Sequence, residues 1–363
     1  MKQGWEIKKI KDICDKASSN IAQNKITELD GDYPVFGASG FVQNVDFYHR
    51  DTEYIGIVKD GSGVGRVNTY PAYSSLLGTL QYIIPKEGYA LNYVAYALKS
   101  LNLAEYASGA AIPHIYFKDY GEETISVPPR EEQERIVAEL DCLSGVIEKK
   151  REHLRELDAL AQSIFYQMFG DPITNEKGWD ILPFNEVADV VGGSTPKTNI
   201  EEYWNGDNYW ATPAELHGER YIYSTERSIT DDAVNKTHLT LLPIGTVLLS
   251  SRAPIGKVCI TRVPMYCNQG FKNIICSDRL HCEYVYQFLF EKTEYLNSLG
   301  TGATFKEISK RVVEQITIPV PPMGLQYQFA ERIDRIEQQK ELIKKSISET
   351  ETLFNARMDY YFN

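Results

Sequence analysis

The stretch "SVPPREEQERIV" occupies residues 126–137, and a second version of it, "PVPPMGLQYQFA", occupies residues 319–330. Both stretches join a double proline to a run of helix-forming residues. Proline is tolerated at the start of a helix, because the N–H that it lacks would have no partner there. Each stretch therefore predicts a junction between a folded segment and the first turn of a helix.

The junction belongs to a longer repeat. Val127 and Val320 correspond with an offset of 193 residues. Three further pairs keep the same order: "SGA" at 108–110 with "TGA" at 301–303, "GVGRV" at 63–67 with "PIGKV" at 254–258, and "GWEIKKIKDIC" at 4–14 with "GWDILPFNEVA" at 178–188. Because the offset drifts while the order is kept, the pattern indicates a duplicated domain with loops of unequal length.

The first part of each half, about 4–129 and 178–322, has the character of a mixed α+β globule. Short apolar runs broken by turn residues, such as "EYIGIVKDGSGVGRV" (53–67) and "GTVLLSSRAPIGKVCI" (245–260), predict strand–turn–strand units. The stretches "LNYVAYALKSLNLAEYA" (91–107) and "CEYVYQFLFEKTEYLNSL" (282–299) predict amphipathic helices.

The second part of each half predicts a long helix with a coiled-coil seam. Apolar or small residues follow a 4–3 spacing at Ile136, Leu140, Leu143, Ile147, Leu154, Leu157, Ala161, Ile164 and Met168, which only Lys150 interrupts. In the second copy the same phase gives Phe329, Ile333, Ile336, Ile343, Ile347, Phe354 and Tyr361, interrupted by Lys340, Thr350 and Arg357. Each seam needs a partner, since a helix of about 57 Å is too long for one small globule to cover.

We therefore predict an α+β fold of two pseudo-symmetric mixed α/β globular domains, separated by two long helices that form an antiparallel coiled coil. The domain boundaries follow from the junctions: globules at 1–130 and 170–322, a central helix at 131–169 and a C-terminal helix at 323–363. Packing of each helix on its own globule is the alternative. Two different heads on one rod suit a bipartite DNA target, because two-headed readers place their heads about one turn of B-DNA apart.

Composition limits the functional classes. The 363 residues carry a net charge of −12, which by itself argues against phosphate binding but leaves room for a locally basic face. No apolar run approaches a membrane span and the N-terminus lacks a signal-peptide core, so we expect a cytoplasmic protein without membrane contact. The six cysteines form no CxxC pair, and we expect buried thiols, not disulfides or a metal site. Only Cys259, Cys267, Cys276, Cys282 and His281 group closely enough to merit a metal assay.

Motifs for catalysis are missing from the sequence. "APIGKV" (253–258) lacks the Ser or Thr of a phosphate loop, "GSGVGR" (61–66) spaces its glycines unlike a dinucleotide loop, and HExxH is absent. The six histidines are scattered. We expect no enzyme activity and no cofactor, and we keep as an alternative a nuclease or methyltransferase with an unrecognised site.

The ordered set of motifs closely resembles one family. The stretches "MFGDPITNEKGWDILPFNEVADVVGGSTPKT", "YWNGDNYWATPAELHG", "LLSSRAPIGKVCI", "CNQGFKNI" and "IPVPPMGLQYQF" are similar to the specificity (S) subunits of type I restriction–modification systems. The resemblance covers essentially the whole chain, and "YPVFGASGFV" (33–42) and "SLLGTLQYI" (75–83) are looser counterparts in the first half.

This resemblance implies the partners. An S subunit reads DNA with two target-recognition domains and binds two methyltransferase (M) subunits, which methylate adenine using S-adenosylmethionine. It can also recruit restriction (R) subunits. In the family the helical regions are the docking surfaces for M subunits, which implies partner contacts at Glu132, Gln133, Arg135, Ile136, Gln326, Phe329 and Ile333. A scaffold that binds M subunits without reading DNA is a further alternative.

Residue types then predict the DNA contacts. Arg and Lys suit guanine and phosphate, Asn and Gln suit adenine, and Gly-rich turns let the backbone approach a phosphate. In the second domain these types collect in the loops at 192–198, 250–257 and 268–273, at Ser194, Thr195, Lys197, Ser251, Arg252, Lys257, Asn268, Gln269 and Lys272. In the first domain the equivalents are Lys59, Ser62, Arg66, Asn68, Tyr73 and His114.

Overall fold

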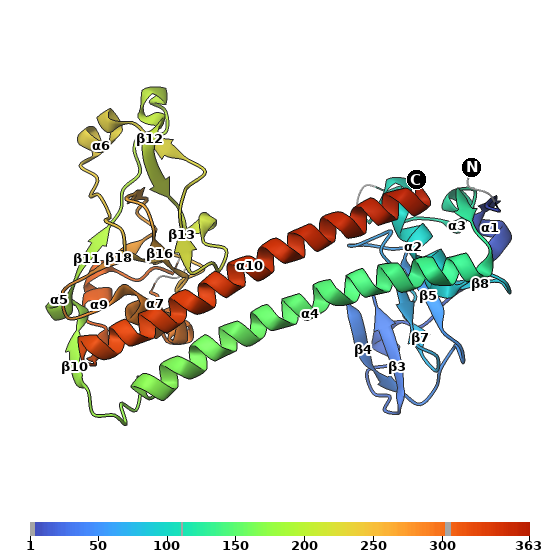
Figure 1. Cartoon of the computed structure of the whole chain (residues 1–363), viewed down its shortest axis with the longest axis horizontal. Helices are drawn as coiled ribbons and strands as arrows, with labels where there is room; N and C mark the ends of the chain where they lie inside the picture. The colour runs from blue at the N-terminus through green and yellow to red at the C-terminus, as the bar shows by residue number, and fades with distance from the viewer. Residues whose placement is uncertain (1–3, 110–111, 302–305) are drawn as a thin grey trace. The chain divides into compact units, whose positions relative to one another are not determined.

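The structure is a computed structural model that describes residues 4–109, 112–301 and 306–363. The chain divides into two compact units: unit 1 comprises Met1–Glu152 and Lys344–Asn363, and unit 2 comprises His153–Ile343. Each unit contains a mixed α/β globule and part of both long helices, α4 (Arg130–Phe169) and α10 (Met323–Phe362), drawn in green and red in Figure 1. The predicted α+β class with two long helices is confirmed.

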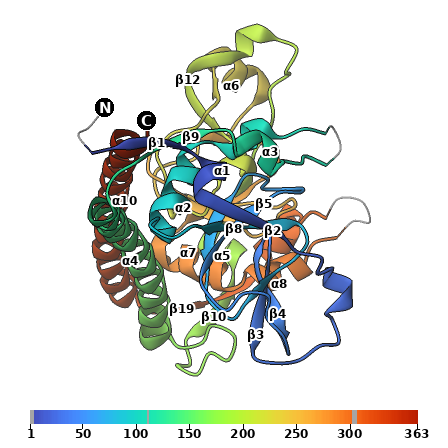
Figure 2. The same ribbon diagram turned by 90° about the vertical axis from the view of Figure 1, so that its right-hand side faces the viewer.

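The described residues of unit 1 form three sheets. Strand β1 (Glu6–Lys9) pairs antiparallel with β9 (Thr124–Val127). The largest sheet is antiparallel and has the order β2 (Cys14–Ser18), β8 (Leu80–Pro85), β5 (Tyr54–Val58), β6 (Val67–Tyr70). In the third sheet β3 (Tyr33–Gly37) lies between β4 (Gly40–Val45) and the parallel β7 (Ser75–Leu76). Helix α2 (Leu91–Ser100) packs on the largest sheet (Figures 1 and 2).

Unit 2 repeats this plan. Strand β10 (Asp180–Pro183) pairs antiparallel with β19 (Thr317–Val320). The largest sheet has the order β11 (Ala188–Gly192), β18 (Lys272–Cys276), β15 (Val247–Leu249), β16 (Val258–Thr261), β13 (Tyr221–Ile222). The third sheet has β12 (Trp204–Ala211) between β14 (Ser228–Ile229) and the parallel β17 (Tyr266–Cys267). Helix α7 (Cys282–Glu291) packs on the largest sheet.

Short helical turns complete both units. In unit 1 they are α1 (Ile10–Ile13), η1 (Gln23–Lys25), η2 (Leu103–Tyr106) and α3 (Phe117–Tyr120). In unit 2 they are α5 (Phe184–Val187), η3 (Glu201–Tyr203), η4 (Pro213–Glu215), α6 (Asp231–Thr237), α8 (Thr293–Ser298) and α9 (Lys310–Glu314). The predicted helices at 91–107 and 282–299 are each interrupted: the first ends before Asn102, which adopts φ 44°, and the second breaks at Lys292.

The register of the strand pairs β1–β9 and β10–β19 shows that the sequence repeat is a duplicated fold. Glu6 faces Val127 in unit 1, and Asp180 faces Val320 in unit 2. The offsets between these equivalents are 180 − 6 = 174 and 320 − 127 = 193, the two values found in the sequence. The predicted hairpins form as β5–β6 and β15–β16. Unit 2 adds β13 at the edge of the shared sheet order.

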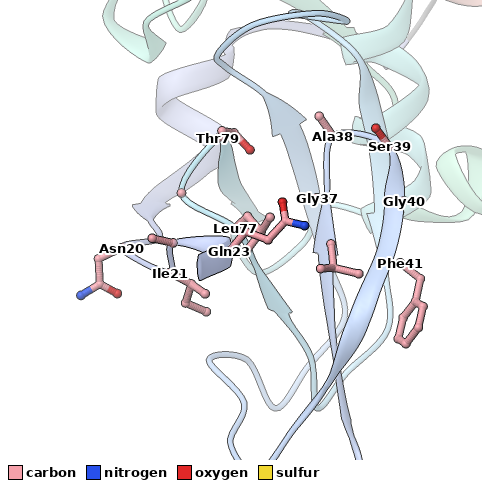
Figure 3. A pocket seen from close by; sticks show the side chains of 13 residues that line it. Asn20, Ile21, Gln23, Gly37, Ala38, Ser39, Gly40, Phe41, Leu77 and Thr79 are labelled. Atoms are coloured by element: carbon pink, nitrogen blue, oxygen red, sulfur yellow. The ribbon is translucent and has the colours of Figure 1, made fainter. Parts of the chain in front are cut away.

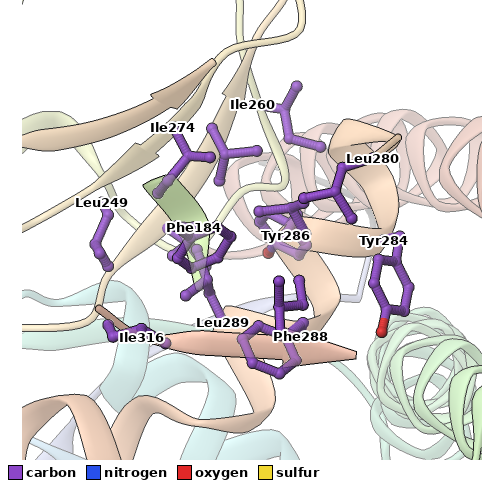
Figure 4. Packing of buried hydrophobic residues seen from close by; sticks show 14 of the residues in the cluster. Phe184, Leu249, Ile260, Ile274, Leu280, Tyr284, Tyr286, Phe288, Leu289 and Ile316 are labelled. Atoms are coloured by element: carbon purple, nitrogen blue, oxygen red, sulfur yellow. The ribbon is translucent and has the colours of Figure 1, made fainter. Parts of the chain in front are cut away.

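The long helices take part in the core of each unit. In unit 2, Tyr284, Phe288 and Leu289 of α7 pack on the sheet residues Ile260 and Ile274 (Figure 4). The same core includes Phe165 and Phe169 from α4 and Phe329 and Ile333 from α10, and the ring of Phe165 lies 5.7 Å from Tyr284 and 5.8 Å from Phe329. Burial of this apolar surface fixes the helices to the globule.

The predicted seam is buried in both units, and it shows the helices antiparallel. In unit 1 the N-terminal part of α4, with Ile136 and Leu140, packs against Phe354 and Tyr361 near the end of α10. In unit 2 the later part of α4, with Leu157, packs with the early part of α10. The alternative, in which each helix lies only on its own globule, is wrong, because α4 and α10 share both cores.

The polar residues that interrupt the seam bind across it. Lys150 Nζ donates to the hydroxyls of Ser346 (2.7 Å) and Thr350 (2.9 Å), so two of the interruptions meet each other. Lys340 pairs with Asp158 at 2.7 Å, and Arg357 pairs with Glu139 at 2.8 Å. Polar groups at seam positions favour one register over others, and here their partners lie on the opposite helix.

A buried glutamine fixes each proline junction. Gln326 is fully buried; its Oε1 accepts from His281 N at 2.8 Å, and its Nε2 donates to Pro321 O (2.8 Å) and Arg279 O (3.0 Å). Gln133 makes the matching bonds to Ala90 N (2.8 Å), Pro128 O (2.9 Å) and Gly88 O (3.5 Å). One amide thus joins the double proline, the long helix and the start of α2 or α7.

No helix in the described part of the chain is long and apolar enough to cross a membrane.

Replacing Gln326 with Ala should destabilise unit 2 by about 2–4 kcal/mol, because buried backbone groups of His281 and Pro321 lose their partners. Gln338→Ala is the matched control, since Gln338 is exposed and donates to Asp334 one turn away; it should change stability by less than about 0.5 kcal/mol. Urea unfolding of the full chain, with hydrogen exchange of the α7 amides, measures both. Equal effects of the two variants would contradict the assignment.

Candidate nucleic-acid interface

The three loops singled out in the second domain converge in unit 2. Ser194 N donates to Cys267 O at 3.0 Å, and the hydroxyl of Thr195 donates to Oε1 of Gln269. Ser251 N donates to Gly270 O at 2.8 Å. The loops at 192–198, 250–257 and 268–273 therefore lie side by side.

Strand register explains why these loops meet. Gly192 pairs with Lys272 at one end of β11–β18, and Leu249 pairs with Val258 at the closing end of β15–β16. Ser250 bridges to Phe271 beside them. Gly193 allows the close approach, since a Cβ on it would lie 2.2 Å from Asn268 O. The local sequence thus places three loop segments at one end of the sheet.

The side chains in this surface differ in their availability. Lys197, Arg252 and Gln269 are exposed. Lys257 donates from Nζ to Leu216 O at 2.9 Å, and Ser251 is buried and donates to Gly270 O at 3.0 Å. Lys257 and Ser251 therefore brace the loops, while Lys197, Arg252 and Gln269 lie at the solvent-exposed surface of the loops.

Arg252 and Lys272 share one carboxylate. Nε of Arg252 lies 3.1 Å from Oε2 of Glu307, and Nζ of Lys272 lies 3.3 Å from Oε1 of Glu307. Burial raises the pKa of this carboxyl, but hydrogen bonds from Lys272 and Arg252 outweigh burial and hold the pKa below its usual range. Glu307 is therefore an anion at neutral pH, and it neutralises part of the charge that the composition of these loops suggested.

Sequence reasoning missed Arg227. Its guanidinium lies over the ring of Trp204 at 3.8 Å and 5.1 Å from the ring of Trp210. The indole of Trp210 donates to Ser194 O at 3.0 Å, so this stack borders the loop at 192–198. The two tryptophans in "YWNGDNYW" (203–210) were the available signal, because guanidinium groups often lie over indole faces.

In unit 1 the structure brings four of six predicted residues together. Ile115 N donates to Lys59 O at 3.0 Å, and His114 contacts Asp60 through Nδ1. Ser62 and Arg66 lie in the turn that follows, where Gly63 adopts φ +85° and a Cβ on it would lie 1.8 Å from Nη2 of Arg66. Lys59, Ser62, Arg66 and His114 thus surround one loop.

Asn68 and Tyr73 lie elsewhere in unit 1. Asn68 faces Gly56 within the β5–β6 pairing, one residue from Val67, which pairs with Ile57. Tyr73 follows the far end of β6, where its ring lies 5.2 Å from that of Tyr48. The hairpin carries these two residues away from the turn that holds Arg66.

A cavity of about 740 Å³ borders the unit 1 loop. Three segments line it, at 20–23, 37–42 and 77–79 (Figure 3). The carbonyl of Thr79, on its rim, accepts from Lys59 N (3.0 Å) and Asp60 N (3.3 Å). Unit 1 therefore joins a recess to its cationic loop.

Most of the residues expected to bind partners are buried in their own unit. Gln133, Ile136, Gln326, Phe329 and Ile333 are at most 2% exposed. Their side chains hold α4 and α10 to the globules, so they are not available to another chain. Arg135 is exposed and bonds to Glu132 at 2.7 Å, and these two lie on the outer side of α4.

The six cysteines differ in burial: Cys142 is exposed, and Cys276 and Cys282 are half-buried. Cys14, Cys259 and Cys267 are buried, and burial raises the pKa of the Cys259 thiol to about 12. Among the residues that the structure describes, no group of three or more His, Cys, Asp or Glu side chains could hold a metal ion.

Arg220 was also missed, and it lies in a buried charge network of unit 2. Its guanidinium bonds to Glu337 of α10 (3.3 Å), Glu283 of α7 (3.2 Å) and Gln287 of α7 (2.6 Å), and it lies 4.1 Å from the ring of Tyr286. Arg220 precedes β13, so the network ties that edge strand to both helices. An isolated arginine in the sequence carries no sign of such burial.

Comparison with known proteins places these features in a family. The model of the type I restriction modification DNA specificity domain matches residues 2–158 and 176–352. A type I restriction enzyme specificity subunit of Methanocaldococcus jannaschii is 41% identical over 180 residues, covering 47% of this chain and 42% of the relative. The chain thus spans less than half the length of that relative.

Two further relatives cover more of the chain. A type I restriction enzyme specificity subunit of Escherichia coli is 24% identical over 282 residues, covering 75% of this chain and 69% of the relative. The crystal structure of a type I restriction–modification S subunit from M. genitalium matches 99% of this chain and 96% of its own length, with a TM-score of 0.66 and 15% identity. At that identity the structural match supports the fold.

Substituting Arg220 with Leu should destabilise unit 2 by about 3–5 kcal/mol, because Glu283 and Glu337 are left buried without their shared cation. Arg311→Leu, at an exposed position of α9, is the control and should cost less than about 0.5 kcal/mol. Chemical unfolding of the full chain compares the two variants. A small loss at Arg220 would mean that water reaches the network and solvates both carboxylates.

Proposed function

This chain belongs to the family of type I restriction modification DNA specificity domains, and we propose that it is the sequence-specific DNA-binding subunit of a type I restriction–modification complex. The observation that carries the proposal is the duplicated fold, in which cationic and amide side chains of unit 2, and Lys59, Ser62, Arg66 and His114 of unit 1, lie in loops beside the largest sheet. These are the residue types that contact phosphates and base edges.

We propose residues 1–130 and 170–322 as the two target-recognition domains, and 131–169 and 323–363 as the helices that connect and space them. The two domains share strand order but not loop sequence, since "KDGSGVGRV" (59–67) corresponds to "SSRAPIGKV" (250–258). Different donors at equivalent places would read different bases. The target is therefore bipartite and asymmetric, with an unread spacer between two unlike half-sites.

Within unit 2 the proposed contacts have separate roles. Arg252 and Lys197 are exposed cations for phosphate or guanine, and Asn268 and Gln269 supply amides for adenine. Lys272 adds a third cation beside them. Ser194, Thr195, Ser251 and Lys257 hold the loops in place, with backbone N–H groups available to phosphate oxygens. In unit 1, Lys59, Ser62, Arg66 and His114 take the equivalent positions.

The partners follow from the family. We propose double-stranded DNA and two methyltransferase (M) subunits, with restriction (R) subunits as a possible addition to the complex. The outer faces of α4 and α10, including Glu132 and Arg135, are the proposed docking surfaces. The chain itself would be non-catalytic, cytoplasmic and free of cofactor, so that it positions the adenine methyltransferase on DNA and leaves the chemistry to the partner.

The decisive test of the function is the methylation pattern. In cells that carry type I M subunits, the chain should direct adenine methylation to one split motif with two different halves. Genome-wide mapping of methylated adenine with and without the chain measures this. If M subunits are present and no split motif changes, the proposal is wrong. Turnover of DNA by the purified chain with Mg²⁺ and S-adenosylmethionine would support an enzyme instead.

Charge reversal in the interface separates a DNA reader from a scaffold. Arg252→Glu should weaken duplex binding by at least about tenfold and lower the slope of log K against log salt by about 0.9, because one phosphate contact is lost. Lys345→Glu is the control, since Lys345 is an exposed residue of α10 paired with Glu349. Fluorescence anisotropy of the full chain measures both. Unchanged binding and methylation in Arg252→Glu would favour the scaffold.

A further inference from the structure

One carboxylate in each unit contacts two of the proposed DNA-binding side chains. In unit 2, Glu307 spans Arg252 and Lys272, with one oxygen toward each, at 3.1 Å and 3.3 Å. In unit 1, Asp60 contacts His114 through Oδ1 and lies 3.9 Å from Nζ of Lys59 through Oδ2. Both units therefore hold an internal anion within the surface proposed to meet DNA.

These pairs occupy the same place in the duplicated fold. Arg252 bridges to Glu307, and Thr301 also bridges to Glu307. In unit 1 Asp60 bridges to His114, and Ser108 also bridges to His114. The offsets are 252 − 60 = 192 and 307 − 114 = 193, as expected for equivalent positions.

Acid and base are exchanged between the two units. The acid lies after β5 in unit 1, on Asp60, whereas in unit 2 it lies on the opposite side of the bridge, on Glu307. Each unit therefore has a carboxylate at one of the two bridged positions and a nitrogen-bearing side chain at the other, and the two are exchanged between the units. Because the carboxylate is present in both units but on different segments, what the two units share is an anion at this place. The segment that supplies the anion differs.

The surroundings of Glu307 suit a phosphate. A carboxylate presents two oxygens to two cations, much as a backbone phosphate presents its two unbridged oxygens. Lys272 also donates to the hydroxyl of Ser251 at 3.2 Å, which fixes its ammonium in place. Glu307 is partly exposed, with 37% of its side chain accessible, so that a ligand can reach the pair from solvent.

We propose that Glu307 is an internal counter-ion that occupies the position of a DNA phosphate on Arg252 and Lys272, and that DNA must displace it to bind. Asp60 has the same role in unit 1. The inference rests on the proposed DNA-binding function and deepens it. A surface ion pair is weak and salt-screened, so a duplex can replace it. Every duplex must make this exchange, and only a target that also supplies base contacts recovers the loss.

The test is binding of the full chain to a random-sequence duplex between 50 and 200 mM salt, by fluorescence anisotropy. Glu307→Gln should bind more tightly at low salt, and its slope of log K against log salt should be steeper by about 0.9, as for one added phosphate contact. Over a fourfold range of salt that slope difference amounts to about threefold in affinity. Glu307→Asp keeps the charge and should resemble the parent chain.

Glu314→Gln is the matched control. Glu314 pairs with Lys310 at 3.5 Å on α9, and its replacement removes the same charge without touching Arg252 or Lys272. This variant should stay within about twofold of the parent, because Glu314 pairs with Lys310 and its loss leaves the contacts of Arg252 and Lys272 unchanged. An equal gain in both variants would overturn the proposal, since net charge alone would then explain the effect.

The remaining outcomes distinguish failure of the counter-ion role of Glu307 from failure of the proposed DNA binding. If the parent chain binds the duplex and Glu307→Gln shows the same affinity and slope, Glu307 is only a structural tie and the counter-ion role is wrong. If neither the parent chain nor any variant binds DNA at 50 mM salt, the proposed function itself fails. Asp60→Asn tests the same prediction in unit 1, and it decides the question where Glu307→Gln does not fold.

Discussion

A single buried amide in the first turn of each long helix sets the geometry on which the rest of the protein depends. Gln326 links the carbonyl of Pro321, the N–H of His281 at the start of α7 and, through the helix backbone, all of α10. Gln133 makes the same three-way link for α4. A proline lacks an N–H but keeps a carbonyl that needs a partner when buried. The double proline and the glutamine therefore act as one structural unit. Each long helix needs this unit at its start, so the junction occurs in both halves of the sequence.

Much of the fold could be predicted because it depends on periodic or repeated features. The offset of 193 residues and the 4–3 spacing both survive in the register of β10–β19 and in the buried seam of α4 and α10. The polar residues that interrupt the seam could be identified in the sequence, but the residues that bind them could not. Lys150 and Thr350 are 200 residues apart in the sequence, and only the antiparallel register brings them together.

The candidate interface was predicted less completely, for a physical reason. Residue type shows which side chains could bind DNA, but burial and pairing decide which of them do. Lys257 donates a hydrogen bond to a backbone carbonyl, and Lys272 forms an ion pair with Glu307. Arg227 and Arg220 looked alike in the sequence, yet one lies exposed on a tryptophan and the other is buried among carboxylates. Burial also divides the residues expected to bind partners, because positions such as Phe329 hold the helix to its own globule while Arg135 is exposed.

The two units share the features that determine the fold and differ in the loops proposed to contact a ligand. Both units share the strand order, the glutamine junction and the bridged side-chain pair. Each of these features holds backbone segments in place. The loops between them differ in sequence, in the added strand β13 and in the stack of Arg227 on Trp204. The contact between a carboxylate and a nitrogen-bearing side chain also occurs in both units, but the carboxylate and its partner have changed places. Duplication followed by such exchange gives two surfaces of equal architecture and unequal chemistry, as the proposed reading of two different half-sites requires.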